Sequence, residues 1–385
     1  MGVPREEIRS LLEKYPTPPI VATVGSHSAL DIADGAITEG FVSLVLAEKG
    51  RDATYSKYFL TVRRPDGDRL RGCVDEVWVL PKFADLASPA SQERLRARGA
   101  LLVPNRALSS YVPLDAIEND LRVPIVGSRS MLRIEERTER ENYYTLLESA
   151  GIPTPKVLPA PEAIDGLSMV KLPHATRRLE RGFFAAATPT EYHAKVEQLV
   201  ARGVVARDDL AHARIERYVL GPVFNFNFFF SPLVPRAEGL ELLGVDDRRE
   251  SNLDGLVRLP AAQQLELREG DRIPEYTVVG HGTLTVRESI LEEVFRLGEK
   301  FVDASKARYP PGILGPFCLQ TCIDSSGKLV VFDVAARIGG GTNVHLGLGH
   351  PYGNALWRGP MSSGRRIALE VRRALEQDRL AEVVT

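Results

Sequence analysis

The chain has 385 residues, of which 44% are hydrophobic, so it can form two or three domains with substantial cores. Lysine and arginine number 49 against 51 acids, and the formal charge of -2 argues against nucleic-acid or anionic-membrane partners. No segment approaches the ~20 apolar residues of a membrane span, and the first segment lacks the apolar stretch of a signal peptide. Three cysteines form neither a disulfide framework nor a paired metal motif, so we expect a cytoplasmic protein.

Residues 1–134 carry a repeated pattern of strands and helices. Short apolar runs typical of strands occur at residues 20–24, 41–48, 76–80, 99–105 and 123–128. Helical spacing of small apolar residues follows the first run, and helical stretches separate several of the others. Because strands that alternate with helices form parallel sheets, we predict a doubly wound α/β domain over this region.

Residues 135–385 have a different, α+β pattern. An amphipathic helical stretch ends at Gly151, and two strand patterns then flank a basic loop at residues 174–182. Phenylalanine occupies every second position from Phe224 to Phe230, as in a strand with one apolar face, and we expect these rings in the core. A β-hairpin is predicted near residues 315–338, and an amphipathic helix closes the chain.

A polar loop follows the first predicted strand. Gly25 would let a ligand approach the backbone, while Ser26, His27 and Ser28 can donate to phosphate oxygens. The helix that follows would present free N–H groups and its positive dipole end to the same ligand. An ordinary helix cap by Ser26 or Ser28 uses the same residues, so both interpretations stay open.

A cationic segment begins at Lys171, which ends a predicted strand. Arg177, Arg178 and Arg181 follow in the basic loop, and four cations around a loop can neutralise a polyphosphate. A solvated basic loop is the alternative. If a nucleotide binds, the backbone of residues 215–221 could recognise its adenine, with Glu216 near the ribose.

Polar groups and glycines end the predicted hairpin. Period-two alternation places Asp333 and Arg337 on one strand face, with Gln320 across the hairpin. An acid, an amide and an arginine at strand ends can hold a magnesium ion and a transferred phosphate. Glycines 339–341 would let the chain pass close to these groups before Asn343, although a strand that ends in a flexible turn is also typical of this pattern.

Six segments, in this order, carry a resemblance to a known family: VATVGSHSALDIADGA, DAIENDLRVPIVGSR, LLGVDDRRESNLDGLVRLP, GPFCLQT, VVFDVAARIGGGTN and MSSGRRIALEV. In them the chain resembles the archaeal FAICAR synthetases of purine biosynthesis, a branch of the ATP-grasp ligases, over essentially its full length. The resemblance implies a preATP-grasp domain at residues 1–134 and a two-lobed ATP-grasp fold at residues 135–385. The smaller lobe would span about residues 155–220.

The resemblance also implies a reaction of IMP biosynthesis. ATP phosphorylates formate, and the amine of the aminoimidazole carboxamide ribonucleotide AICAR attacks the formyl phosphate to give FAICAR. Formate is a poor electrophile until one of its oxygens becomes a phosphate leaving group, so the enzyme mainly positions reactants and neutralises charge. ATP and Mg²⁺, or Mn²⁺, are the implied cofactors, formate and AICAR the small-molecule partners, and a homo-oligomer the implied assembly.

Matching blocks imply roles for individual residues. The nucleotide substrate would be bound by His27, Ser28 and Asn252. ATP would be bound by Lys171, Arg178, Arg181, Glu216, Tyr218 and Val219. The magnesium ligands would be Gln320 and Asp333, and catalysis would use Arg337 and Asn343.

Several positions depart from the family pattern. Gln320 and Asp333 stand where the family has glutamates, and Ala335 stands where a polar third ligand is common. Arg106 and Ala107 align where the family has a substrate-binding serine after a His-Gly pair. The departures leave two alternatives open: a paralogous ATP-grasp ligase for another acid and amine, and a nucleotide-binding protein without turnover.

Overall fold

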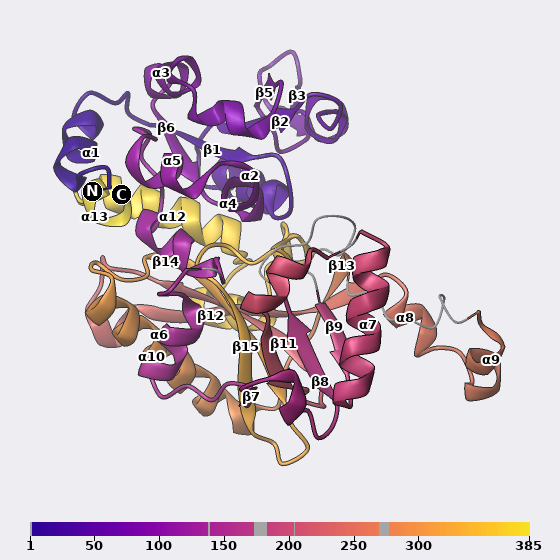
Figure 1. The fold of residues 1–385 in the computed structure, drawn as a ribbon. Coiled ribbons are helices and arrows are strands. Elements are labelled where there is room, and N and C mark those ends of the chain that lie inside the picture. Colours follow the sequence, from indigo (N-terminus) through magenta and orange to yellow (C-terminus); the bar gives the residue numbers. More distant parts are fainter. Residues whose placement is uncertain (1, 138, 173–182, 204, 269–276) are drawn as a thin grey trace.

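The computed structural model describes residues 2–137, 139–172, 183–203, 205–268 and 277–385. Figure 1 shows an N-terminal sheet with its helices on one side of the molecule and two further sheets on the other. Within the described part of the chain, every helix is too short or too polar to cross a bilayer.

The N-terminal region forms the parallel sheet that the sequence predicts. Its strands are β1 (Ile20–Val24), β2 (Ser43–Glu48), β5 (Glu76–Leu80) and β6 (Ala100–Val103), in the order β5-β2-β1-β6. All neighbouring strands run parallel. The strand expected at residues 123–128 is reduced to two isolated bridges, since Ile125 pairs with Leu102 and Val126 pairs with Val384 near the end of the chain.

Short helices cover this sheet. They are α1 (Arg5–Leu12), α2 (Ala29–Thr38), α3 (Pro89–Ala97), α4 (Arg106–Tyr111) and α5 (Leu114–Asn119), and a small hairpin of β3 (Val62–Arg63) and β4 (Arg69–Arg71) extends from one edge. Buried apolar side chains from the strands and from α3, α4 and α5 form one core of this region. The polar loop at residues 25–28 connects β1 to α2, so it lies at the carboxyl end of β1.

A small antiparallel sheet follows in the chain. Its strands are β7 (Val157–Leu158), β8 (Ser168–Lys171), β9 (Phe183–Ala186) and β10 (Arg214–Arg217), in the order β7-β10-β8-β9. Helix α7 (Pro189–Ala201) packs on it through Tyr192 and Val196. The two strands predicted on either side of the basic loop are therefore confirmed as β8 and β9, while residues 173–182 lie outside the described residues.

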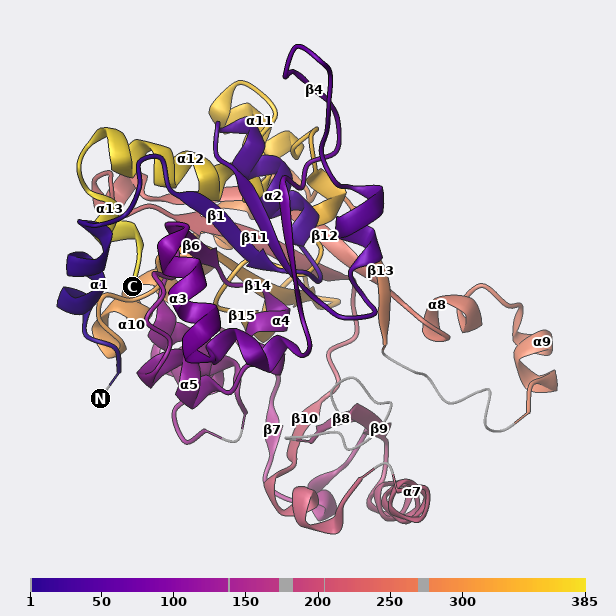
Figure 2. The same cartoon turned by 90° about the horizontal axis from the view of Figure 1, so that it is seen from above.

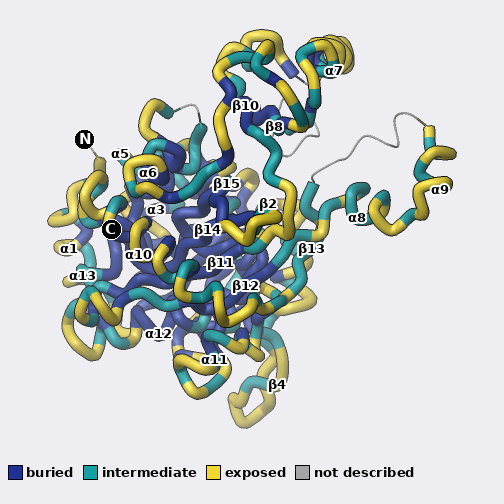
Figure 3. Tube along the Cα trace, turned by 90° about the horizontal axis from the view of Figure 1, so that it is seen from below, coloured by how far each residue is buried: buried dark blue, intermediate teal, exposed yellow. Residues whose placement is uncertain are grey.

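The third sheet is antiparallel and contains most of the predicted hairpin. Its strands are β11 (Val223–Phe230), β12 (Leu240–Glu250), β13 (Val278–Thr283), β14 (Gly315–Ile323) and β15 (Leu329–Ala335), in the order β13-β12-β11-β14-β15. Phe226 and Phe228 face the core beneath α6 (Tyr143–Ser149) and α10 (Leu291–Arg308), which confirms the predicted apolar strand face. Asn225 and Asn227 face the opposite way. Figure 3 shows that β11 and β14 are largely buried, while β13 at the sheet edge is more exposed.

Two short helices, α8 (Leu253–Leu256) and α9 (Ala261–Glu266), extend away from the body between β12 and β13 (Figure 2). The last helices of the chain are α11 (Pro351–Trp357), α12 (Ser363–Glu376) and α13 (Leu380–Val383). Helix α11 packs on β12, whereas α12 packs on α2 and α13 on α1, so the end of the chain joins the N-terminal region although the sequence predicts a division at residue 134.

Two glycines allow α12 to pack closely on α2. A Cβ atom at Gly35 would overlap the backbone of Gly364, and one at Gly364 would overlap the carbonyl group of Asp31. The Asp31 carboxylate is fully buried in this contact and accepts the N–H of Gly364 at 3.0 Å. Burial raises the pKa of Asp31 to about 6. This helix pair attaches the C-terminal segment to the N-terminal sheet.

We expect Gly364→Ala to destabilise the protein by about 1–3 kcal/mol, because the added methyl group overpacks the α2–α12 contact. The measurement is the free energy of unfolding in urea. Gly255→Ala is the matched control, since it adds the same methyl group in α8 with nothing within 4 Å, and there alanine favours the helix. Equal unfolding midpoints for the two variants would contradict the close packing.

Candidate functional site

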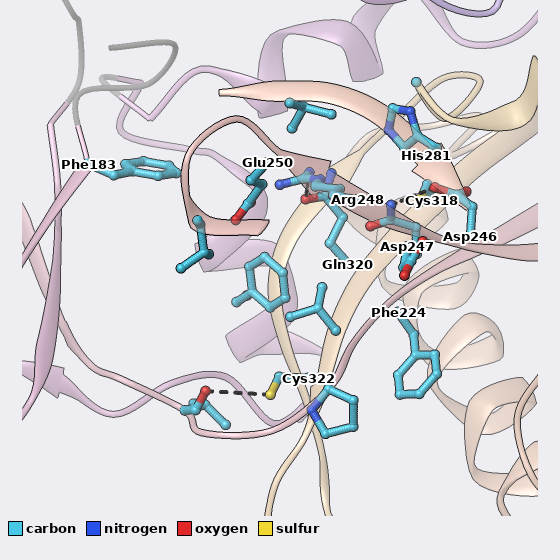
Figure 4. A pocket seen from close by; sticks show the side chains of 18 of the residues that line it. Phe183, Phe224, Asp246, Asp247, Arg248, Glu250, His281, Cys318, Gln320 and Cys322 are labelled. Atoms are coloured by element: carbon cyan, nitrogen blue, oxygen red, sulfur yellow. Dashed lines mark hydrogen bonds between the residues drawn. The ribbon is translucent and has the colours of Figure 1, made fainter. Parts of the chain in front are cut away.

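A cavity of about 640 Å³ lies where the three sheets meet. Its walls come from the polar loop after β1, from the small sheet, and from the face of the third sheet opposite the phenylalanine core (Figure 4). The site residues predicted from the sequence that line it are His27, Lys171, Glu216, Tyr218, Val219, Gln320 and Arg337. Residues from three separate parts of the chain therefore meet at this cavity.

Other predicted residues are placed differently. Ser28, Asn252, Asp333 and Asn343 are absent from the described lining of the cavity, although each is adjacent to a segment that lines it. Arg178 and Arg181 lie outside the described residues. The cavity shows where seven of the predicted residues lie, and the roles assigned to all thirteen stay predictions.

Lys171 and Glu216 form a buried ion pair on adjacent strands of the small sheet. Lys171 Nζ lies 2.5 Å from Glu216 Oε2, and both side chains are almost completely buried. Arg214 Nε donates to the other oxygen of Glu216 at 2.6 Å. Lys171 Nζ also donates to the carbonyl oxygen of Phe332 at 3.0 Å, so the ammonium group connects the small sheet to β15.

The segment after β10 crosses from the small sheet to the third sheet along the cavity. Tyr218 N donates to Leu167 O at 3.0 Å, which continues the sheet hydrogen bonding beyond the strand. Val219 O accepts from Cys322 Sγ at 3.5 Å. Burial raises the pKa of Cys322 to about 11, so this side chain is a neutral thiol that can donate. All three cysteines are free and buried.

Gln320 and Asp333 face each other across β14 and β15. They are direct neighbours in the antiparallel register, which places their Cβ atoms roughly 4.5–5.5 Å apart. Gln320 Oε1 accepts from Arg248 Nη2, as Figure 4 shows. Asp333 Oδ1 accepts Val334 N at 3.1 Å and lies 3.8 Å from Arg137 Nη2.

This pair fits one mode of magnesium binding. Among the described residues, no group of three or more His, Cys, Asp or Glu side chains could hold a metal ion. Mg²⁺ often uses one or two protein oxygens and completes its shell with phosphates and water. One carboxylate and one amide oxygen on the same sheet face meet that requirement, provided that Gln320 releases Arg248.

A buried acid joins two arginines at the cavity. Glu135 Oε2 lies 3.3 Å from Arg337 Nη2 and 3.5 Å from Arg106 Nη1. Glu135 Oε1 accepts Ala336 N at 2.9 Å. Arg337 is only 4% exposed, and its Nε has no hydrogen-bond partner among the described residues. Glu135 thus holds Arg106 of the N-terminal region and Arg337 of β15 in one charged cluster.

The polar loop docks on the glycine segment through two side chains. Asn343 Nδ2 donates to His27 O at 2.9 Å, while Asn343 Oδ1 accepts Asp31 N at 3.1 Å in the first turn of α2. Ser28 Oγ donates to Gly339 O instead of capping its own helix. The cap of α2 therefore comes from Asn343, far away in the chain, and the local cap considered in the sequence analysis is absent.

The backbone of glycines 339–341 passes so close to neighbouring side chains that little room is left for side chains of its own. A Cβ atom at Gly339 would overlap the amide oxygen of Asn227, and one at Gly341 would overlap the carboxylate of Asp246. A Cβ atom at Gly340 would lie 3.4 Å from His27 Cδ2. Close approach of the backbone, rather than a left-handed conformation, explains these glycines, because none of the three has positive φ.

The sequence analysis missed a buried polar cluster on the same wall. Asp246 is 1% exposed and accepts the amide groups of Asn225 at 2.7 Å and Asn227 at 2.6 Å. Burial raises the pKa of Asp246 to about 6, although these two hydrogen bonds lower it. A usable signal was present, because asparagines that alternate with core phenylalanines must face something other than the apolar core.

Comparison with known proteins identifies relatives along the whole chain. A family model described as "Protein of unknown function (DUF1246)" matches residues 21–158, and one described as "Domain of unknown function (DUF1297)" matches residues 191–385. A Methanocaldococcus jannaschii protein named 5-formaminoimidazole-4-carboxamide-1-(beta)-D-ribofuranosyl 5'-monophosphate synthetase is 39% identical over 385 residues, which covers 100% of both chains.

Solved structures agree with this likeness. A crystal structure of an IMP biosynthesis protein PurP from Thermococcus kodakaraensis matches with a TM-score of 0.68 and 30% identity, over 95% of this chain and 100% of that one. The ADP complex of PurK, an N5-carboxyaminoimidazole ribonucleotide synthetase, matches with a TM-score of 0.59 and 10% identity, over 90% of this chain and 79% of that one. The second likeness concerns the fold alone, and the predicted ATP-grasp fold is confirmed.

We expect Glu135→Gln to cost about 3–5 kcal/mol of stability, because Arg337 would keep a buried charge without its acid. Unfolding in urea measures the loss. Glu139→Gln is the control, since Glu139 pairs with Arg133 at 2.7 Å but is 38% exposed, and such a pair contributes under about 1 kcal/mol. A loss for Glu135→Gln no larger than for the control would show that Arg337 does not need this acid.

Proposed function

The chain belongs to the family of 5-formaminoimidazole-4-carboxamide ribonucleotide (FAICAR) synthetases, and we propose that it is an ADP-forming ligase that formylates AICAR with ATP and formate. ATP would phosphorylate formate, and the AICAR amine would attack the formyl phosphate to give FAICAR, as a step of IMP biosynthesis. Phosphorylation makes the formyl carbon electrophilic, and the protein supplies orientation and charge neutralisation.

The observation that carries the proposal is the shared cavity. His27 of the N-terminal region, the Lys171–Glu216 pair of the small sheet, and Gln320 and Arg337 of the third sheet line the same cavity. A ligase of this kind must hold a nucleoside triphosphate, a small acid and a nucleotide acceptor together, away from water. Three walls from different parts of the chain around one cavity support that arrangement.

We assign ATP to the side of the cavity formed by the small sheet. Lys171 would contact phosphate oxygens together with Arg178 and Arg181, and the backbone at Tyr218 and Val219 would recognise adenine. Since Glu216 is bonded to both Lys171 and Arg214, its role in this proposal is to position the lysine as well as to border the ribose.

Mg²⁺, or Mn²⁺, would be held by Gln320 and Asp333 together with ATP phosphates. When bound, the ion would neutralise phosphate charge. Arg337 would contact the transferred phosphate with the N–H group that lacks a partner among the described residues.

We place the nucleotide substrate against the N-terminal wall. His27, held by the Ser26 hydroxyl at 2.8 Å and by Asn343 through its carbonyl group, would contact AICAR. Ser28 follows His27 in the polar loop, and Asn252 follows β12 and precedes Leu253, which lines the cavity. These two residues complete the proposed substrate set. Asn343 would act by holding the His27 loop in place.

One observation favours a second candidate, a paralogous ligase for another acid and amine. Arg106 lines the cavity and is ion-paired to Glu135, so the N-terminal wall carries a cation next to the proposed nucleotide site. A nucleotide-binding protein without turnover is the third candidate, and the hydrogen bond from Arg248 to a proposed metal ligand favours it. We also propose a cytoplasmic homo-oligomer, following the family resemblance.

The direct test is ADP release by the purified protein with Mg²⁺, formate and AICAR, with mass-spectrometric detection of FAICAR. We expect ADP release to require both formate and AICAR, because both are substrates of the overall reaction. Release that occurs only with a different acid and amine would establish the second candidate instead. ATP binding without turnover across such a panel would establish the third.

We expect Gln320→Glu to lower the Mg²⁺ concentration for half-maximal activity by on the order of tenfold, because a carboxylate attracts the ion more strongly than an amide. A Mg²⁺ titration at fixed ATP measures the shift. Gln198→Glu adds the same charge on the exposed face of α7 and should leave the titration unchanged. Loss of activity at all Mg²⁺ concentrations would show that the Arg248–Gln320 contact has a separate function.

A further inference from the structure

Four polar residues form a continuous row across the third sheet. Asp246 on β12 is opposite Asn225 on β11, and Asn225 is opposite Gln320 on β14. Gln320 is in turn opposite Asp333 on β15. Neighbouring strands are about 4.8 Å apart, so the Asp246 end of this polar row lies roughly 10 Å from Gln320. All four side chains are at least nine-tenths buried.

The two ends of the polar row suit different chemistry. Gln320 and Asp333 offer oxygen ligands and are flanked by Arg248 and Arg137, which suits phosphate and a metal ion. At the other end, Asp246 and Asn225 offer acceptors, and both line the cavity. Figure 4 shows Asp246 beside His281 at one end of the cavity.

Hydrogen bonding to Asp246 fixes the orientation of the two amide groups at this end of the polar row. A carboxylate only accepts hydrogen bonds, so Asn225 and Asn227 must turn their NH₂ groups toward Asp246. Each amide oxygen then points away, and neither has a partner among the described residues. A buried acceptor without a partner costs about 1–3 kcal/mol, and an N–H donor from a ligand would remove that cost.

Asp246 also lies close to the proposed nucleotide site. Its carboxylate faces Gly341, while His27 faces the adjacent Gly340. Two of the roughly four acceptor positions of the carboxylate are used by the asparagines, which leaves capacity for a ligand. The charged and titratable groups around it are Arg248, Asp247, His281 and the thiol of Cys318.

From this geometry we propose that Asn225 and Asp246 bind the amine of the nucleotide substrate, and that Asp246 takes the amine proton during transfer. The proposal rests on the proposed function. Asn225 Oδ1 and an Asp246 oxygen would each accept one N–H of the amine. As the nitrogen attacks the formyl carbon, the C–N bond forms and the C–O bond to phosphate breaks. The bonding pair leaves on the phosphate oxygen, and the proton moves to Asp246.

The acid–base properties of Asp246 are consistent with that role. Burial raises its pKa to about 6, so the group is a carboxylate at neutral pH but a stronger base than an exposed aspartate. The rate of transfer should therefore fall as the pH drops below about 6, where the carboxylate becomes protonated.

The test is Asp246→Asn, assayed separately for the two half-reactions. Formate phosphorylation is followed by formate-dependent ¹⁸O exchange between the β,γ-bridge and β-nonbridge positions of ATP without AICAR. Transfer is followed by single-turnover FAICAR formation from pH 5 to 8. We expect exchange to persist, transfer to fall by about 10²–10⁴-fold, and the decline below about pH 6 to disappear.

Asp31→Asn is the matched control. Asp31 is as deeply buried as Asp246 and has a pKa raised to the same region, but it lies in the α2–α12 contact. This variant should keep the decline at low pH whatever its overall rate, because Asp31 is not the group whose titration the proposal invokes. Asn225→Ser is the second variant, and it should raise the KM for AICAR by about tenfold without changing the KM for formate.

The outcomes separate the two proposals. Full transfer by Asp246→Asn, or equal loss of exchange and transfer, would overturn the inference while the wild type still makes FAICAR. If Asp246→Asn does not fold, an unchanged KM for AICAR in Asn225→Ser would overturn it. Wild-type protein without formate- and AICAR-dependent ADP release would overturn the proposed function itself, and the inference with it.

Discussion

The burial of polar side chains on one face of the third sheet constrains the rest of this structure. Asp246, Asn225, Gln320 and Asp333 lie in register across four strands, removed from water. Since a buried polar group without a partner is costly, each member of the polar row needs a counterpart from another part of the chain. Arg248 and Arg137 supply two of these counterparts, and the proposed substrates would supply others.

The backbone of the glycine segment passes close to the polar row and forms one side of the cavity. Glycines 339–341 run between Asn227 and Asp246 on one side and His27 on the other. Ser28 and Asn343 then fasten the loop after β1 to the same segment. The N-terminal region is thereby brought to the face of the third sheet, and a nucleotide held by His27 would reach the acceptors at Asp246.

Buried ion pairs place the cations around that space. Lys171 is held by Glu216 and reaches across to β15, while Glu135 joins Arg106 to Arg337. Lys171 with Glu216, and Arg337 with Glu135, have side chains that are at most 5% exposed, so these two cations have little freedom to move. Such fixed charges suit stabilisation of phosphate during transfer, because they need little reorganisation when charge develops.

Local patterns in the sequence determined much of this architecture. Alternating strands and helices predicted the parallel sheet, the period of Phe224 to Phe230 predicted a strand with a core face, and the hairpin around residues 315–338 was correctly placed. The family resemblance added the ATP-grasp fold, which the comparisons confirm. These features depend on residues near one another in the chain, where spacing alone carries the information.

Only the tertiary structure decided how distant segments meet. The return of α12 to α2, the cap of α2 by Asn343, the Glu135 cluster and the cross-strand polar row each join residues that are far apart in sequence. Hydrophobic periodicity reports which face of an element is buried, but not what covers that face or which register two strands adopt. Polar contacts inside the cavity follow from that register, and for this reason Asp246 emerged only when the strands were seen together.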